Sequence, residues 1–167
     1  MNGVVDTPLT GRVLVAGIGN IFLGDDGFGV EVAQRMSGHN LPPNVTIADF
    51  GIRSLHLAYE LLDGYDTLVL VDTVGLGEEP PGTVVLIEPE IDAGGATPLD
   101  AHTMNPETVL ASLRQLGGEV HRLLLVGCQP ATLEEGIGLS APVAAAVDEA
   151  VRVVNDLIGE RADMGPV

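Results

Sequence analysis

Three stretches of the chain carry residues that could hold a divalent metal ion. Two adjacent acids, Asp25 and Asp26, follow an apolar run near the start of the chain, Asp72 ends another apolar run, and His102 lies in a long polar stretch. Carboxylate oxygens and an imidazole nitrogen form a ligand set that suits a borderline ion such as nickel or zinc. Such a set leaves coordination positions open for water or for a substrate. These residues predict a metal site if the fold brings them into one water-accessible pocket.

The apolar runs are typical of strands that are buried on both faces of a parallel sheet. We expect strands at 12–18, 45–50, 67–73 and within 121–130, and helices at 25–36, around 55–62, at 105–116 and at 140–158. The link between residues 73 and 83 is too short for a parallel crossover, so we expect the strand at 83–89 to run antiparallel, at or near an edge. The predicted fold is therefore a three-layer α/β/α sandwich, with a mostly parallel five-stranded sheet, one antiparallel strand and helices on both faces.

The periodicity of apolar residues supports each helix. The second helix is predicted from Leu55, Ala58, Tyr59 and Leu62, and the third from a buried stripe that ends at Leu116. In a doubly wound sheet, binding sites form at the carboxyl ends of the strands where the winding direction reverses. If the first and third strands are neighbours and the second lies outside, the acids at 25, 26 and 72 flank that crevice.

The other candidates depend on their local context. His102 can reach the crevice, because a loop of about 13 residues spans some 40 Å at roughly 3.3 Å per residue. We expect one of the two adjacent acids, Asp25 or Asp26, to cap the following helix. By pattern alone, Asp49 is typical of a turn, and Cys128 of a small buried hydrophobic residue.

Composition limits the classes of partner. The 167 residues, 46% of them hydrophobic, suit a single domain at 1–167 with a core at about 11–159. The 24 acids against seven basic residues leave a net charge of −17, which argues against nucleic acids and anionic membranes as partners. A single cysteine excludes an internal disulfide, and neither a signal-peptide pattern nor a membrane-length apolar run is present, so we expect a cytoplasmic protein.

Several motifs resemble one known family. GIGNIFLGDDGFGVEVAQRM at 17–36 is similar to the opening of the nickel-iron hydrogenase maturation proteases, which have a Gly-x-Gly-Asn loop, an acid pair and a glycine-rich helix start. The resemblance continues in order and spacing through ADFG at 48–51, LVLVDT at 68–73, DAHTMNP at 100–106, LLVGCQP at 124–130 and GIGLS at 136–140. It covers essentially the whole chain apart from the first ten residues and the tail.

This resemblance implies a function and a set of site residues. The family removes a short C-terminal extension from the hydrogenase large-subunit precursor once nickel is in place. The implied metal contacts are Asp26, Asp72 and His102, and Asp49 becomes a candidate catalytic acid. Many members have Glu at the position of Asp26, whose side chain reaches about 1.5 Å less far. The resemblance also implies that nickel is carried by the precursor as a checkpoint, without a permanently bound cofactor, and we expect a monomer.

The sequence leaves two questions open. Water can be activated by a carboxylate acting as general base or by the nickel ion itself. The same three ligands would also serve a noncatalytic metal-sensing chaperone for the precursor, or an unrelated metal-dependent hydrolase that acts on small molecules.

Overall fold

The computed structural model describes residues 9–38, 40–89 and 106–163. His102 and the rest of the stretch 90–105 lie outside the described residues. Within the described ranges one sheet is formed by β1 (Val13–Ile18), β2 (Val45–Gly51), β3 (Thr67–Thr73), β4 (Val84–Ile87) and β5 (Arg122–Cys128). The helices are η1 (Gly24–Gly27), α1 (Phe28–Met36), α2 (Ser54–Leu61), α3 (Pro106–Gln115) and α4 (Ala141–Asp163).

The sheet has the strand order β2-β1-β3-β5-β4. β1 lies between β2 and β3, and these pairs and the β3–β5 pair are parallel, so the winding direction reverses between β1 and β3. β4 pairs antiparallel with β5 at the edge, from Val84 opposite Cys128 to Ile87 opposite Leu125. The strand order around β1 therefore meets the condition under which the acids flank the crevice, and the predicted antiparallel edge strand is confirmed.

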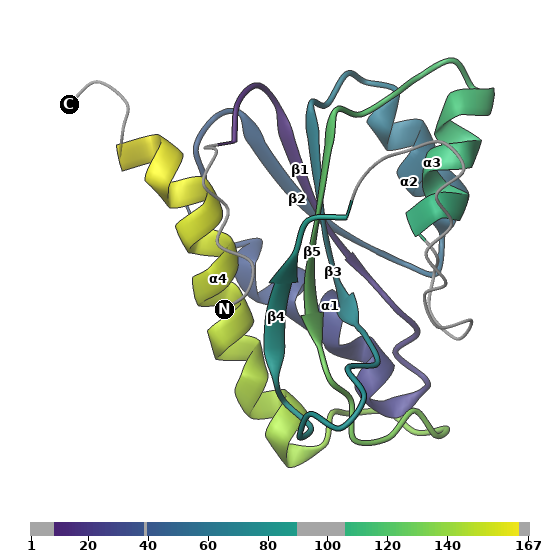
Figure 1. Ribbon diagram of the computed structural model, residues 1–167, viewed down its shortest axis with the longest axis vertical. Helices are drawn as coiled ribbons and strands as arrows, with labels where there is room; N and C mark the ends of the chain where they lie inside the picture. The colour runs from purple at the N-terminus through teal and green to yellow at the C-terminus, as the bar shows by residue number, and fades with distance from the viewer. Residues whose placement is uncertain (1–8, 39, 90–105, 164–167) are drawn as a thin grey trace.

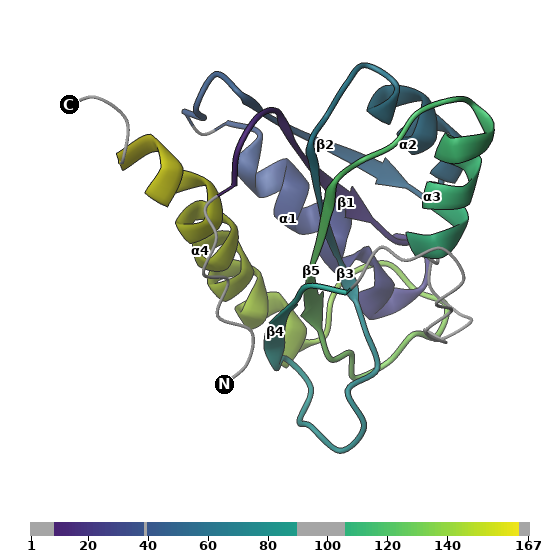
Figure 2. The same ribbon diagram turned by 45° about the horizontal axis from the view of Figure 1, so that its top comes forward.

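Helices cover both faces of the sheet (Figures 1 and 2), with α1 and α4 on one face and α2 and α3 on the other. Alternate strand residues face the two layers because successive side chains of a strand point to opposite sides. Val69 and Val71 of β3 pack with α1 and α4, whereas Leu68 and Leu70 pack with α2 and α3. The predicted three-layer sandwich is confirmed.

The buried face of α2 differs from the one that its periodicity suggested. Leu57, Ala58 and Leu61 are buried, whereas Leu55 and Tyr59 remain 51% and 54% exposed. Leu62 and Leu116, which follow the ends of α2 and α3, are also exposed. Both stripes of α2 are apolar, so the spacing of its residues does not decide which stripe packs against α3 and the sheet.

Among the described residues, none of the helices combines the length and the apolar character needed to cross a membrane.

Candidate active site

Glycines let α1 pack directly against the backbone of the sheet. A Cβ atom on Gly29 would collide with the carbonyl oxygens of Val71 and Ile18, and one on Gly17 would collide with the carbonyl of Gly29. This close approach places η1, the turn before α1, at the carboxyl ends of β1 and β3. The glycine pattern of the 17–36 motif therefore has a packing role, and it positions the acid pair.

Gly19 leaves room between two acids. Its φ of +131° lies in a region that side chains rarely adopt, and a Cβ atom there would collide with the carbonyl of Asp26 and come within 3.4 Å of Asp72 Oδ1. The main chain at residue 19 thus lies between the turn that carries Asp26 and the carboxylate of Asp72. Any larger residue at this position would displace the main chain of the turn that carries Asp26.

Asp26 joins the first loop to the end of β3. Its Oδ2 accepts a 2.8 Å hydrogen bond from the Asn20 backbone N–H, and its Oδ1 accepts a 3.0 Å hydrogen bond from the Thr73 hydroxyl. The residue is only 4% exposed. These two donors fix the carboxylate beside Asp72, the residue that precedes Thr73 in β3.

Asp72 is the second acid of this site, and it is 3% exposed. Its Oδ1 accepts a 2.7 Å hydrogen bond from the Thr73 backbone N–H. Burial raises the pKa of Asp72 well above its ordinary value, and the negative charge of Asp26 is the second cause of this increase. Hydrogen bonds from Thr73 lower the pKa and partly oppose these two effects. The ion pairs among the described residues do not include Asp26 or Asp72. A divalent cation bound between the two carboxylates would relieve their repulsion.

Asp25 points away from this pair. Its carboxylate accepts hydrogen bonds from the backbone N–H groups of Ala131, Thr132 and Ser140, at 2.8, 3.1 and 2.7 Å, and from the Ser140 hydroxyl at 2.9 Å. Burial alone would raise the pKa of Asp25, but these hydrogen bonds outweigh it and lower the pKa. Asp25 thus anchors the loop that precedes α4.

The expectation that one of the adjacent acids caps the helix is wrong. The chain first forms the 3-10 turn η1, and α1 then begins after Gly27. Gly27 is therefore the N-cap residue of α1, and no side chain donates or accepts a capping hydrogen bond there. Asp25 instead binds the 131–140 loop, and Asp26 binds Asn20 and Thr73, because the turn lies between the end of β3 and that loop. Tertiary contacts have replaced the local capping bond.

Asp49 ends up on a different side of the sheet from Asp72. It pairs in register with Gly17 of β1, which pairs with Val71 of β3, so the side chains of these residues share the α1 face. Asp72 follows Val71 and points to the opposite face. Among the described residues, the Asp49 carboxylate lies 3.5 Å from Gln34 Nε2 and 3.9 Å from an Arg53 nitrogen.

His102 and Cys128 are the two remaining residues that the sequence analysis singled out. His102 lies outside the described residues, and the described part of the chain contains no group of three potential metal ligands, so the three-residue ligand set stays a prediction. Cys128 is fully buried in the core beneath α4, as expected. Burial, followed by the nearby charge of Asp25, raises the pKa of its thiol to about 12.

The sequence reasoning missed Asn20, Thr73 and Gly19. Asn20 and Thr73 hold the carboxylate of Asp26, and Gly19 provides the space next to it. Each of these residues lies at the end of a strand that the sequence analysis had already placed at the site. Its position in the sequence is therefore the signal that could have identified it. Residue type alone did not distinguish these residues from ordinary turn residues.

Comparison with known proteins agrees with this geometry. The sequence profile of the hydrogenase maturation proteases matches residues 30–157. The hydrogenase expression/formation protein HupD of Rhizobium leguminosarum bv. viciae is 37% identical over 154 residues, which cover 88% of this chain and 76% of HupD. The hydrogenase 2 maturation protease of Escherichia coli is 32% identical over 145 residues, covering 86% of this chain and 88% of that protein.

A solved structure is similar throughout. The hydrogenase maturating endopeptidase HybD from Escherichia coli superposes with a TM-score of 0.76 at 31% identity, over 90% of this chain and 93% of HybD. The shared fold, the sequence matches and the buried acids at the reversal point of the sheet all agree. The chain therefore belongs to the hydrogenase maturation protease family and is a peptidase.

Proposed function

We propose that this peptidase removes the C-terminal extension of a nickel-iron hydrogenase large-subunit precursor, and that nickel in the precursor is the signal for cleavage. The observation that carries the proposal is the pair formed by Asp26 and Asp72, two buried carboxylates at the reversal point of the sheet without an ion-pair partner among the described residues. In this proposal nickel belongs to the substrate. Because the precursor carries the ion, binding of nickel by the peptidase reports whether the precursor has been loaded.

The electrostatics of the pair explain how loaded and empty precursors are told apart. Nickel that enters with the precursor would balance the charges of Asp26 and Asp72, and in this proposal His102 adds a nitrogen ligand. An empty precursor gains none of this binding energy. A difference of about 4 kcal/mol would favour the loaded form by roughly a thousandfold.

Hydrolysis needs a water molecule to add to the peptide carbonyl carbon, after which the C–N bond breaks and the leaving nitrogen takes up a proton. A carboxylate can accept the proton of the attacking water, and Asp49, which is only partly covered, is the predicted acid for this role. Nickel in the precursor can alternatively polarise the water or the carbonyl group. Replacing Asp49 by Asn distinguishes the two routes. If nickel activates the water or the carbonyl, the variant retains most of the cleavage rate, whereas if Asp49 is the general base, most of that rate is lost.

The proposal is tested with purified precursor in nickel-loaded and nickel-free forms. We expect the intact mass of only the loaded form to decrease by the mass of the extension. Equal processing of both forms would refute the checkpoint, and processing of neither would refute this substrate. Tight binding without any cleavage would favour the noncatalytic chaperone.

A matched pair of variants adds a control. Asp72→Asn should abolish cleavage of the loaded precursor, whereas Asp156→Asn, which changes an exposed acid on α4, should leave it unchanged. Loss of cleavage in both variants would indicate that overall charge, and not the acid pair, controls the reaction.

A further inference from the structure

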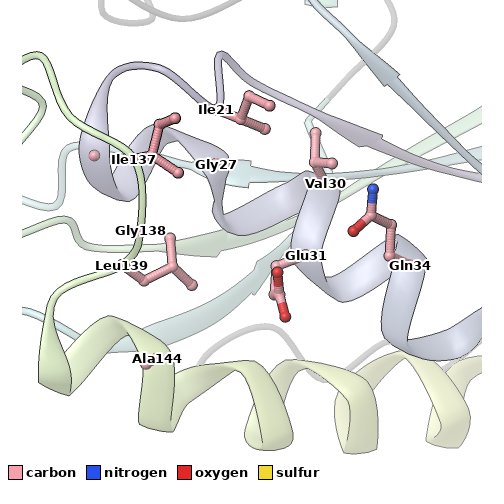
Figure 3. Close-up of a pocket in the computed structure, with 10 residues that line it drawn as sticks. Ile21, Gly27, Val30, Glu31, Gln34, Ile137, Gly138, Leu139 and Ala144 are labelled. Atoms are coloured by element: carbon pink, nitrogen blue, oxygen red, sulfur yellow. The ribbon is translucent and has the colours of Figure 1, made fainter.

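A groove lies beside α1, between this helix, the loop at 136–140 and the first turns of α4 (Figure 3). Its volume is about 370 Å³, within the range of pockets that bind small ligands or single side chains. Its apolar walls consist of Ile21, Val30, Ile137, Leu139 and Ala144. Ile137 is 77% exposed, an unusual position for a large aliphatic side chain at the edge of a pocket.

The walls of the groove are held in place by the turn that carries the acid pair. The Gly24 N–H donates a 2.8 Å hydrogen bond to the carbonyl of Gly136, whose own N–H donates to the carbonyl of Phe22 at 2.9 Å. Asp25 fixes both ends of the same loop through Ala131 and Ser140. The groove is therefore preformed, and its position relative to Asp26 is set by a single turn of the chain.

The polar side of the groove leads to the predicted catalytic acid. Gln34 lines the groove, and its Nε2 donates to Asp49 Oδ2 at 3.5 Å. Glu31 is the charged residue among those that line the groove, in a chain whose net charge is −17. This charge favours a neutral or basic occupant and disfavours an acidic one.

We propose that the groove binds an extended segment of the large-subunit precursor that flanks the cleaved bond, with an apolar side chain against Ile21, Val30 and Leu139. This inference rests on the proposed function, since it assigns a second recognition surface for the same substrate. Gly138 also lines the groove, and a Cβ atom there would meet no other atom within 4 Å, so its lack of a side chain leaves room for a peptide backbone to approach. Peptide sequence and nickel content are thus recognised by different parts of the site.

Two adjacent alanines of α4 provide a matched test. Ala144 and Ala145 are both exposed, but only Ala144 lines the groove. Binding of a fluorescent, metal-free peptide spanning the cleavage site is measured by polarisation, and KM and kcat are measured with nickel-loaded precursor. We expect Ala144→Trp to weaken peptide binding and to raise KM at least tenfold with little change in kcat, whereas Ala145→Trp resembles the wild type. Equal behaviour of the two variants would overturn the proposal.

A second variant tests the proposal independently, in case Ala144→Trp does not fold. Ile137→Asp places a charge in the groove at a highly exposed position, so the fold should tolerate it. It should weaken binding of the same peptide, and a basic residue introduced into the peptide should restore part of the affinity. Unchanged affinity in Ile137→Asp would also overturn the proposal.

The readouts separate this inference from the proposed function. Peptide binding that is lost in Ala144→Trp, together with no cleavage of any precursor by the wild type, would support the groove and refute the function. Cleavage of loaded precursor with an unchanged KM in Ala144→Trp would do the reverse. If sedimentation shows a wild-type dimer that Ala144→Trp converts to a monomer, a second copy of the chain occupies the groove and the assignment is wrong.

Discussion

Asp25 and Asp26 are consecutive residues whose carboxylates bind opposite parts of the fold. Asp25 accepts hydrogen bonds from the backbone of the 131–140 loop, whereas Asp26 accepts one from Thr73 at the end of β3. One acid thus holds a wall of the proposed substrate groove, and the other belongs to the proposed metal pair. A single turn, η1, positions both of these proposed recognition surfaces.

Asp72→Asn should abolish cleavage and also stabilise the protein at pH 8. The pKa of Asp72 is raised in the folded state, so the ionised carboxylate destabilises the fold above that pKa, and this penalty disappears as the pH falls towards the unfolded value. Asparagine carries no charge, so we expect a gain of about 1 kcal/mol at pH 8, or roughly 2–4 °C in Tm. Thermal unfolding at pH 8 and at pH 4 measures the difference, which should shrink at the lower pH. A variant less stable than the wild type at pH 8 would contradict the burial argument.

Asp25→Ala should destabilise the protein by about 3 kcal/mol, because three backbone N–H groups would lose a charged acceptor. The pKa of Asp25 is lowered in the folded state, so its contribution is present above the unfolded value and is lost as the pH falls through the folded value. Urea unfolding at pH 7 measures the loss. Asp148→Ala, which removes an exposed partner of Arg35, is the control and should cost less than about 1 kcal/mol. Equal losses in the two variants would argue against the anchoring role.

Thr73→Val should reduce kcat/KM for the loaded precursor by about 10- to 100-fold, the usual effect of removing a group that orients a metal ligand. The change keeps the buried shape of the side chain but removes the hydroxyl that donates to Asp26. Thr73→Ser keeps the hydroxyl and should restore most of the activity. If serine and valine reduce activity equally, the methyl group and not the hydrogen bond is what matters at this position.

Cys128 should resist alkylation in the folded protein. Its thiol is buried and its pKa is raised to about 12, so little reactive thiolate exists at pH 8. Mass spectrometry after treatment with iodoacetamide should find the native protein unmodified and the urea-unfolded protein modified once. Rapid modification of the native protein would show that the core beneath α4 opens readily.

Much of the fold could be predicted because its signals are local. Buried parallel strands are continuous apolar runs, and the short link before β4 excludes a parallel crossover, so the direction of β4 followed from the length of a connection. The α4 stripe of Val143, Val147 and Val154 was also correct, since only one face of that helix is consistently apolar. Asp26 and Asp72 could be paired in advance because carboxyl ends of neighbouring parallel strands share one edge.

Other features needed the tertiary structure because they depend on residues far apart in the chain. Which of two adjacent acids joins β3 was decided by the 131–140 loop, which lies more than 100 residues away from Asp25. Which apolar stripe of α2 is buried was decided by packing against α3, and the register of β2 on β1 placed Asp49 on the face opposite Asp72. A sequence specifies the chemical types and the strand ends, but the direction of a side chain is determined by long-range packing and register, which local periodicity does not encode.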